Sequence, residues 1–88
     1  MPSWLRRPQP DYPSRAQAAG ISGYATVNCA AGRNGRFTDC RITAESPPDV
    51  GFGSALRASM RRASLVPGTT GGMTEDARMI VTIRFGPQ

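Results

Sequence analysis

The sequence lacks histidine and lysine entirely and has only two cysteines among its 88 residues. Histidine is the side chain most often used for proton transfer near neutral pH and for binding transition metals. Two cysteines without histidine cannot supply the four ligands of a structural zinc site. The composition therefore predicts no metal site and no cofactor, and it argues against most kinds of enzyme.

The chain also lacks long apolar runs. No segment approaches the roughly 18 consecutive apolar residues of a membrane-spanning helix, and none has the apolar core of a signal peptide. If the protein is anchored or exported, we expect the responsible segment to lie outside this chain.

The acidic residues show no catalytic pattern. The two cysteines are expected to point into a core, with no neighbouring base to activate them. Five of the six acidic residues are interpreted as loop or polar-face residues: Asp39, Glu45, Asp49, Glu75 and Asp76. We therefore predict that the domain is not an enzyme.

All eleven cationic side chains are arginines, and against six acidic residues they give a net charge of +5. Small basic domains often bind nucleic acid. One alternative is therefore an arginine-rich module that binds an anionic polymer, either nucleic acid or cell-wall glycan; the other is an ordinary solvated surface. The arginines are scattered along the chain, and few aromatic residues accompany them for base stacking. We expect no nucleic-acid partner.

Two alternating runs between Gly23 and Ala44 flank the dipeptide Asn34-Gly35. Asn-Gly between such runs is the strongest local signal for a β-hairpin, because both residues accept a positive φ. A three-residue loop would break the match between the two apolar faces. A two-residue turn places four pairs on the core face: Ala25 with Ala44, Val27 with Ile42, Cys29 with Cys40, and Ala31 with Thr38.

Cys29 and Cys40 face each other in this predicted hairpin. They could remain free, since a buried cysteine behaves as a small hydrophobic residue. They could equally form a disulfide in an oxidising compartment. The sequence alone leaves both states open.

Two helices are predicted around the hairpin. Residues 1–9 should form an extended Pro-rich lead-in, in which Trp4 has no apolar partner at regular spacing and is interpreted as a tail residue. Pro13 to Ala19, followed by Gly20, predicts a short helix. After the hairpin, Phe52 to Leu65 carries an apolar stripe of helical period.

The C-terminal part predicts a third strand. The Gly- and Thr-rich loop of residues 69–75 leaves the start of this strand open. On the polar face of the strand only Ile80 is apolar. The core face carries alternating apolar side chains: Met79, Val81, Ile83 and Phe85.

A helix between the second and third strands makes a crossover, normally right-handed, between parallel strands. With the hairpin antiparallel, the first strand then lies in the middle, giving the order 2-1-3, and the helix covers one face of the sheet. The predicted fold class is α+β, in two layers: a short N-terminal helix and then β-β-α-β, with a three-stranded antiparallel or mixed sheet. A single domain should span residues 10–86, with a tail of residues 87–88.

The motifs in this order resemble the periplasmic C-terminal domain of TonB-type energy transducers, over about residues 8–86. Asn34-Gly35-Arg36 stands at the family's hairpin turn. Where the family usually has Phe or Val in its strands, this chain has smaller residues, and a disulfide could offset the smaller core. The other matching segments are Pro10-Asp11-Tyr12-Pro13, Arg15-Ala16-Gln17-Ala18, Ile21-Ser22-Gly23, and Met60-Arg61-Arg62 followed by Pro67-Gly68.

The resemblance implies a non-enzymatic periplasmic binding domain of an inner-membrane-anchored protein that is driven by the ExbB–ExbD motor. Its partner would be a TonB-dependent outer-membrane receptor for siderophore-iron, haem or cobalamin. The receptor's TonB box would join the domain's sheet as an added strand. The anchor is expected outside this chain, and the exposed edge strand could pair two copies of the isolated domain.

The expected partner-binding residues follow from this resemblance. The third strand contributes its backbone: Met79, Ile80, Val81, Thr82, Ile83, Arg84 and Phe85. The resemblance adds the segment that lies against the box in the family: Gln9, Pro10, Asp11 and Tyr12. Arg15 would pair with a receptor carboxylate, whereas Tyr12 could instead pack as part of a turn. Arg78 and Arg84 are interpreted as solvated charges or as protection of the edge.

Overall fold

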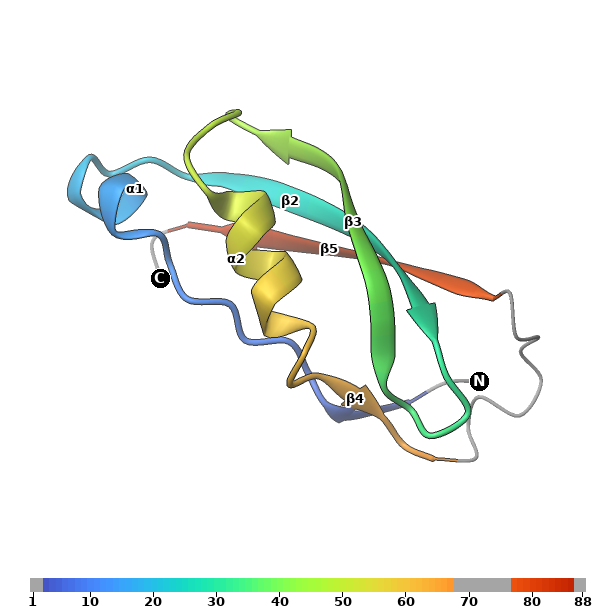
Figure 1. The fold of residues 1–88 in the computed structure, drawn as a ribbon. Coiled ribbons are helices and arrows are strands. Elements are labelled where there is room, and N and C mark those ends of the chain that lie inside the picture. The colour runs from blue at the N-terminus through green and yellow to red at the C-terminus, as the bar shows by residue number, and fades with distance from the viewer. Residues whose placement is uncertain (1–2, 68–76, 87–88) are drawn as a thin grey trace.

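A computed structural model of the chain describes residues 3–67 and 77–86. The loop expected at residues 69–75, together with Asp76 and the tail of residues 87–88, lies outside this part. Figure 1 shows helix α2 lying across one face of a sheet, with the N-terminal segment running beside the helix. The elements in chain order are β1 (Trp4–Arg6), α1 (Ser14–Ala18), β2 (Gly23–Ala31), β3 (Phe37–Ser46), α2 (Phe52–Ser59), β4 (Ser64–Leu65) and β5 (Arg78–Phe85).

Strand β2 is the central strand of a three-stranded antiparallel sheet with the order β3-β2-β5. Helix α2 packs mainly against β2 and β3. The core lies between this helix and the sheet, and its largest fully buried side chains include Phe52, Leu56 and Met60. The predicted core face of β2 is confirmed, because every second residue of the strand is buried: Ala25, Val27, Cys29 and Ala31.

The hairpin turn differs from the prediction. The N–H of Gly32 donates to the carbonyl of Arg36 at 2.9 Å, which encloses a three-residue loop in place of a two-residue turn. Gly35 takes the left-handed φ of 82°, and the Asn34 side chain accepts the N–H of Arg36 at 2.9 Å. A three-residue loop of this kind ends in a left-handed glycine. It shifts the pairing by one residue, so that Ala31 faces Phe37 and not Thr38.

A bulge at Asp39 returns the pairing to the predicted alignment. Asp39 has a φ of 49° and is the extra residue in β3, as expected for a bulge. Immediately after it, Cys40 is joined to Cys29 by a disulfide. Of the two states that the sequence leaves open for these cysteines, the structure has the disulfide. The predicted pair Val27–Ile42 is also present.

A second bulge beyond that pair shifts the far end of the hairpin once more. Ala25 therefore faces Glu45, and the predicted pairing with Ala44 is wrong. The Glu45 carboxylate accepts the N–H of Gly53 at 2.8 Å, in the first turn of α2. Because α2 has no side-chain cap of its own, this carboxylate satisfies a free N–H and lies at the positive end of the helix.

The helices agree with the sequence only in part. The short helix α1 is present, with Gly20 at a φ of 67° just beyond it. Helix α2 ends at Ser59, and its predicted extension to Leu65 is wrong. The N–H of Leu65 donates to the carbonyl of Gly35 at 2.8 Å. This contact with the hairpin loop holds β4 in an extended conformation.

Trp4 is not the tail residue that the sequence predicts. It lies in β1, which pairs antiparallel with β4. Its half-buried ring is 5.7 Å from the ring of Phe37. Both contacts come from segments far away in the sequence, so no local periodicity could reveal them.

Candidate functional site

Strand β5 is an open edge of the sheet: within residues 3–67 and 77–86, it pairs with β2 alone. The register runs unbroken from Gly23↔Phe85 to Ala30↔Arg78, and the N–H of Ala31 extends it by donating to Ala77 at 3.4 Å. Hydrogen-bonded pairs alternate along an antiparallel ladder, so residues 77, 79, 81, 83 and 85 direct their backbone groups toward β2. The residues between them direct their N–H and C=O groups to the open edge: Arg78, Ile80, Thr82 and Arg84.

The side chains of β5 follow the predicted alternation. Val81 and Phe85 are buried, and Met79 and Ile83 are half-buried. The four residues with outward backbone groups have exposed side chains, and Ile80 among them is 67% exposed. The edge thus offers backbone donors and acceptors, while the core side chains hold the strand in place.

Arg78 crosses the outer face of the sheet and ties together all three strands. Its Nη1 donates to Oδ2 of Asp39 at 3.0 Å, and its Nη2 donates to the carbonyls of Asp39 at 2.6 Å and Asn28 at 2.9 Å. Its Nε also donates to the side chain of Asn28. The interpretation of Arg78 as a solvated charge is therefore wrong, whereas its role in protecting the edge stays a prediction. Sequence reasoning missed this contact because Asp39 reaches Arg78 only through the bulge.

These contacts change the electrostatics of Asp39. The hydrogen bond from Arg78 is the largest cause that lowers the pKa of Asp39, followed by the charge of Arg41. Arg41 Nη2 lies 3.4 Å from the same carboxylate oxygen. At neutral pH the carboxylate is therefore ionised and bound by two guanidinium groups.

Tyr12 joins the N-terminal segment to the end of β5. Its ring meets the rings of Phe52 and Phe85 edge-on, each with a centroid distance of 5.8 Å. Those two rings stack at 4.5 Å, and the Tyr12 hydroxyl donates to the carbonyl of Ile21. Tyr12 is thus packed as part of a turn, and its direct contact with a partner stays a prediction.

The other residues expected from the N-terminal segment lie elsewhere. Gln9 and Asp11 are exposed and line a cavity of about 470 Å³ together with Arg6, Arg7, Ser59 and Arg62. Pro10 is half-buried between them. Arg15 is exposed on α1, and Figure 1 places α1 at the end of the sheet where β5 finishes. The structure brings Tyr12 to β5, whereas Gln9 and Asp11 lie toward the end of α2.

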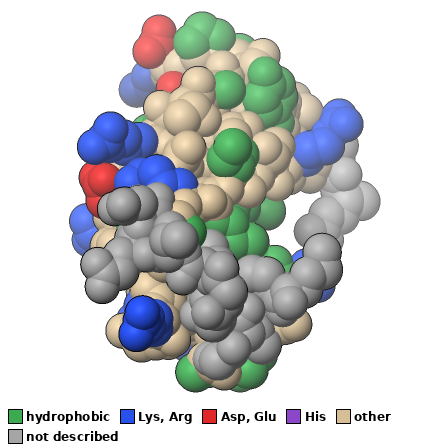
Figure 2. Space-filling view, turned by 90° about the vertical axis from the view of Figure 1, so that its right-hand side faces the viewer, with side chains coloured by type: hydrophobic (Ala, Val, Ile, Leu, Met, Phe, Trp, Pro, Cys, Tyr) green, Lys and Arg blue, Asp and Glu red, His purple; other side chains and the backbone are tan. Residues whose placement is uncertain are grey.

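The arginines do not form one continuous patch on the face that Figure 2 presents, where they appear at several separated places. No helix in the described residues is long and apolar enough to cross a membrane.

Residues 8–87 match the family model of the Gram-negative bacterial TonB protein C-terminal region. The chain belongs to this family. It is 36% identical over 70 residues to Protein TonB of Escherichia coli (strain K12), an alignment that covers 80% of this chain and 29% of that protein. The chain therefore spans less than a third of the length of this TonB relative.

Two solved TonB structures share the fold. The solution NMR structure of the Pseudomonas aeruginosa TonB CTD matches with a TM-score of 0.74 and 23% identity, over 99% of this chain and 87% of that one. The tonb2 protein of Vibrio anguillarum matches with a TM-score of 0.73 and 24% identity, over 98% of this chain and 81% of that one. The fold is thus a TonB C-terminal α+β fold with a three-stranded antiparallel sheet and two helices. No comparison supports the alternative of a module that binds an anionic polymer.

Proposed function

We propose that this domain is the receptor-binding part of a TonB-type energy transducer and captures the TonB box of an outer-membrane receptor as a strand added to β5. The TonB C-terminal family consists of non-catalytic domains that are periplasmic in Gram-negative bacteria. The observation that carries the proposal is the open edge of β5, where residues 78, 80, 82 and 84 direct their backbone groups outward. An extended peptide can satisfy such a row of groups.

The proposed work of the whole protein follows from this contact. The transducer would be held in the inner membrane, driven by ExbB–ExbD, and would couple the proton motive force to uptake of siderophore-iron, haem or cobalamin. A pull along the added strand would load its hydrogen bonds together in shear. The domain itself would transmit force and carry out no chemical reaction.

The size of the edge suits a reversible contact. Four to six hydrogen bonds at about 0.5–1.5 kcal/mol net each supply about 2–9 kcal/mol before the cost of ordering the peptide, which limits the affinity to roughly micromolar or weaker. The half-buried side chains of Met79 and Ile83 offer apolar surface to the inward side chains of the peptide. Such an affinity allows a receptor to be engaged and then released.

The N-terminal residues would support this contact in different ways. Tyr12 would hold the C-terminal end of β5 through Phe85. By the resemblance, the box would also contact Gln9, Pro10 and Asp11, although Gln9 and Asp11 lie toward the end of α2 and not at β5, and Arg15 would pair with a carboxylate of the receptor. These roles are separable by substitution, because Gln9, Asp11 and Arg15 are exposed.

The proposal is tested by removing one outward donor. Proline is tolerated on an edge strand where its missing N–H faces solvent, so Thr82→Pro should keep the bonds to β2 while it removes a bond to the peptide. Thr82→Val is the matched control, since both variants lose the hydroxyl contact with Thr26 but valine keeps the N–H. Binding of a synthetic TonB box peptide is measured by chemical-shift titration at low and moderate salt.

We expect the Thr82→Val domain to bind like the wild type and the Thr82→Pro domain to bind about two- to tenfold more weakly, as loss of one hydrogen bond predicts, with little dependence on salt. Dispersed amide shifts in both variants verify that they are folded. Equal binding by the two variants would contradict strand addition at β5. Binding that moderate salt abolishes would indicate contact through charge alone.

A further inference from the structure

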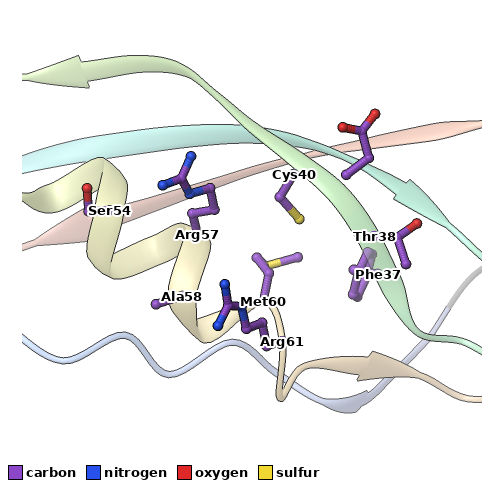
Figure 3. Close-up of a pocket in the computed structure, with 9 residues that line it drawn as sticks. Phe37, Thr38, Cys40, Ser54, Arg57, Ala58, Met60 and Arg61 are labelled. Carbon is purple, nitrogen blue, oxygen red and sulfur yellow. The ribbon is translucent and has the colours of Figure 1, made fainter.

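A cavity of about 550 Å³ opens between α2 and β3, at the opposite edge of the sheet from β5. Its inner wall includes the buried side chains of Phe37 and Met60 and the half-buried Cys40. Figure 3 shows Cys40 and Met60 facing each other between the strand and the helix, with Arg57 and Arg61 projecting from α2 and the turn after it. The cavity thus combines an apolar floor with a basic rim.

Among residues 3–67 and 77–86, the guanidinium groups on this rim have no acidic partner. In the part of the chain that the structure describes, the ion pairs join Asp39 to Arg41 and to Arg78, and none involves Arg57 or Arg61. Asp39 also lines the cavity, but its carboxylate is already bound by those two partners. Within the described part of the chain, no ion pair therefore compensates the positive charge that this rim carries above an apolar floor.

A third arginine lies next to this rim. The Nη2 of Arg36 donates to the carbonyl of Arg61 at 3.2 Å, which holds a guanidinium group at the C-terminal end of α2. Arg57 lies in the last turn of α2, and Arg61 lies in the turn that follows the helix. Alternate residues of an extended peptide lie on one side, about 6.6–7 Å apart, so two carboxylates separated by one residue can both face the two arginines.

Strand addition does not suit this edge. Two bulges interrupt β3, and one of them holds Asp39 at a left-handed φ of 49°. Bulges of this kind protect an edge from pairing with another strand. A partner at this edge must therefore be recognised by its side chains.

We propose that this cavity docks a short acidic segment of a partner protein, in which two carboxylates flank a large apolar side chain. The carboxylates pair with Arg57 and Arg61 on the α2 side. The intervening side chain of an extended segment points the other way, toward Phe37 and Cys40. This second contact goes beyond strand capture and does not depend on it, because the two sites lie on opposite edges of the sheet.

The probe is the peptide acetyl-Gly-Glu-Leu-Glu-Gly-amide, titrated into the labelled domain at low salt. One comparison peptide replaces both Glu by Gln, and another replaces Leu by Ala. We expect amide shifts at residues 37–40 and 57–61, at least fivefold weaker binding of the Gln peptide, and at least threefold weaker binding of the Ala peptide. The same shifts should appear in the Thr82→Pro domain, which separates this site from strand capture at β5.

The charge variants form a matched pair. Arg57→Gln/Arg61→Gln and Arg6→Gln/Arg7→Gln remove the same charge from exposed side chains, but the second pair lines the other cavity. The first double variant should weaken binding at least fivefold and the second less than twofold. If the two double variants weaken binding equally, or if the Ala and Leu peptides bind equally well, the contact is only a general attraction between charges. Either result would overturn the proposal. Shifts of residues 57–61 on raising the protein concentration alone would instead indicate that a second copy occupies the cavity, and would also overturn it.

Discussion

Arg78 of β5 and Asp39 of β3 form an ion pair of 3.0 Å although the central strand β2 lies between their strands. The pair exists because the bulge at Asp39 brings this residue onto the outer face of the sheet, where Arg78 can reach both its carboxylate and its carbonyl. The contact anchors the start of the strand that we propose to carry the receptor peptide.

Removal of Arg78 should change the titration of Asp39. We expect Arg78→Gln to raise the pKa of Asp39 toward its ordinary value of 3.8, and Arg41→Gln to raise it less, because the hydrogen bond from Arg78 is the larger cause. Titration of the side-chain carboxyl resonance by NMR measures both shifts. A larger shift in Arg41→Gln than in Arg78→Gln would show that the order of the two causes is wrong.

The same pair predicts a pH dependence of stability. The pKa of Asp39 is lower in the folded state than in the unfolded state. Its ionised carboxylate therefore adds fully to the free energy of unfolding at pH values above the unfolded pKa. This addition is lost as the pH falls through the folded pKa. The difference in urea stability between the wild type and Arg78→Gln should therefore be present at pH 6 and shrink below about pH 4. A difference that stays constant down to pH 2 would contradict this linkage.

The Cys29–Cys40 disulfide should stabilise the hairpin. It closes a short loop, with a sequence separation of 11, for which loss of chain entropy predicts at most about 3 kcal/mol. We expect reduction to lower the free energy of unfolding by about 2–3 kcal/mol in urea titrations. The double variant Cys29→Ala/Cys40→Ala is the control, because its stability cannot change when reductant is added. If reduction leaves the unfolding midpoint unchanged, the disulfide adds nothing to stability.

Gly35 should be far less replaceable than Gly20. Both have a left-handed φ, of 82° and 67°, and a side chain in that region costs about 1–2 kcal/mol. A Cβ at Gly35 would also lie 2.2 Å from the carbonyl of Leu65, whereas a Cβ at Gly20 meets nothing within 4 Å. Gly35→Ala should therefore destabilise the domain clearly more than Gly20→Ala in thermal or urea unfolding. Equal losses would mean that the loop does not approach Leu65 so closely.

Trp4 should stabilise the β1–β4 pair through its contact with Phe37. We expect Trp4→Ala to destabilise the domain by about 1–2 kcal/mol, because the ring is only half-buried. Leu5→Ala on the same strand is the control, since Leu5 is 65% exposed and should change stability little. Wild-type fluorescence from this single Trp should shift to longer wavelength on unfolding. An emission maximum already at the unfolded position would contradict the packing of Trp4.

The local patterns of the sequence predicted most elements of the fold. The alternating residues of β2 and β5 and the turn signals around α1 reflect burial and backbone conformation, which a short window of sequence records. The length of the hairpin loop and the end of α2 depend instead on the contact between Gly35 and Leu65. That contact joins distant segments, so a local pattern could not predict it.

The candidate site, like the fold, could be predicted from local sequence patterns only in part. The alternation of β5 indicates which side chains face the core. The outward direction of the backbone groups of Ile80 and Thr82 becomes known only from the register with β2. The ion pair of Arg78 was missed for the same reason, because its partner Asp39 is brought near by a bulge that no sequence motif indicates.

Residue-by-residue amide hydrogen exchange, with and without a synthetic TonB box peptide, tests strand capture at β5 most directly. The peptide should slow exchange at Ile80, Thr82 and Arg84, whose N–H groups face the open edge. Val81 and Ile83 should change little, because their N–H groups already face β2. This alternating protection is the result that strand addition predicts. Uniform slowing along β5, or slowing confined to residues 9–12, would contradict it.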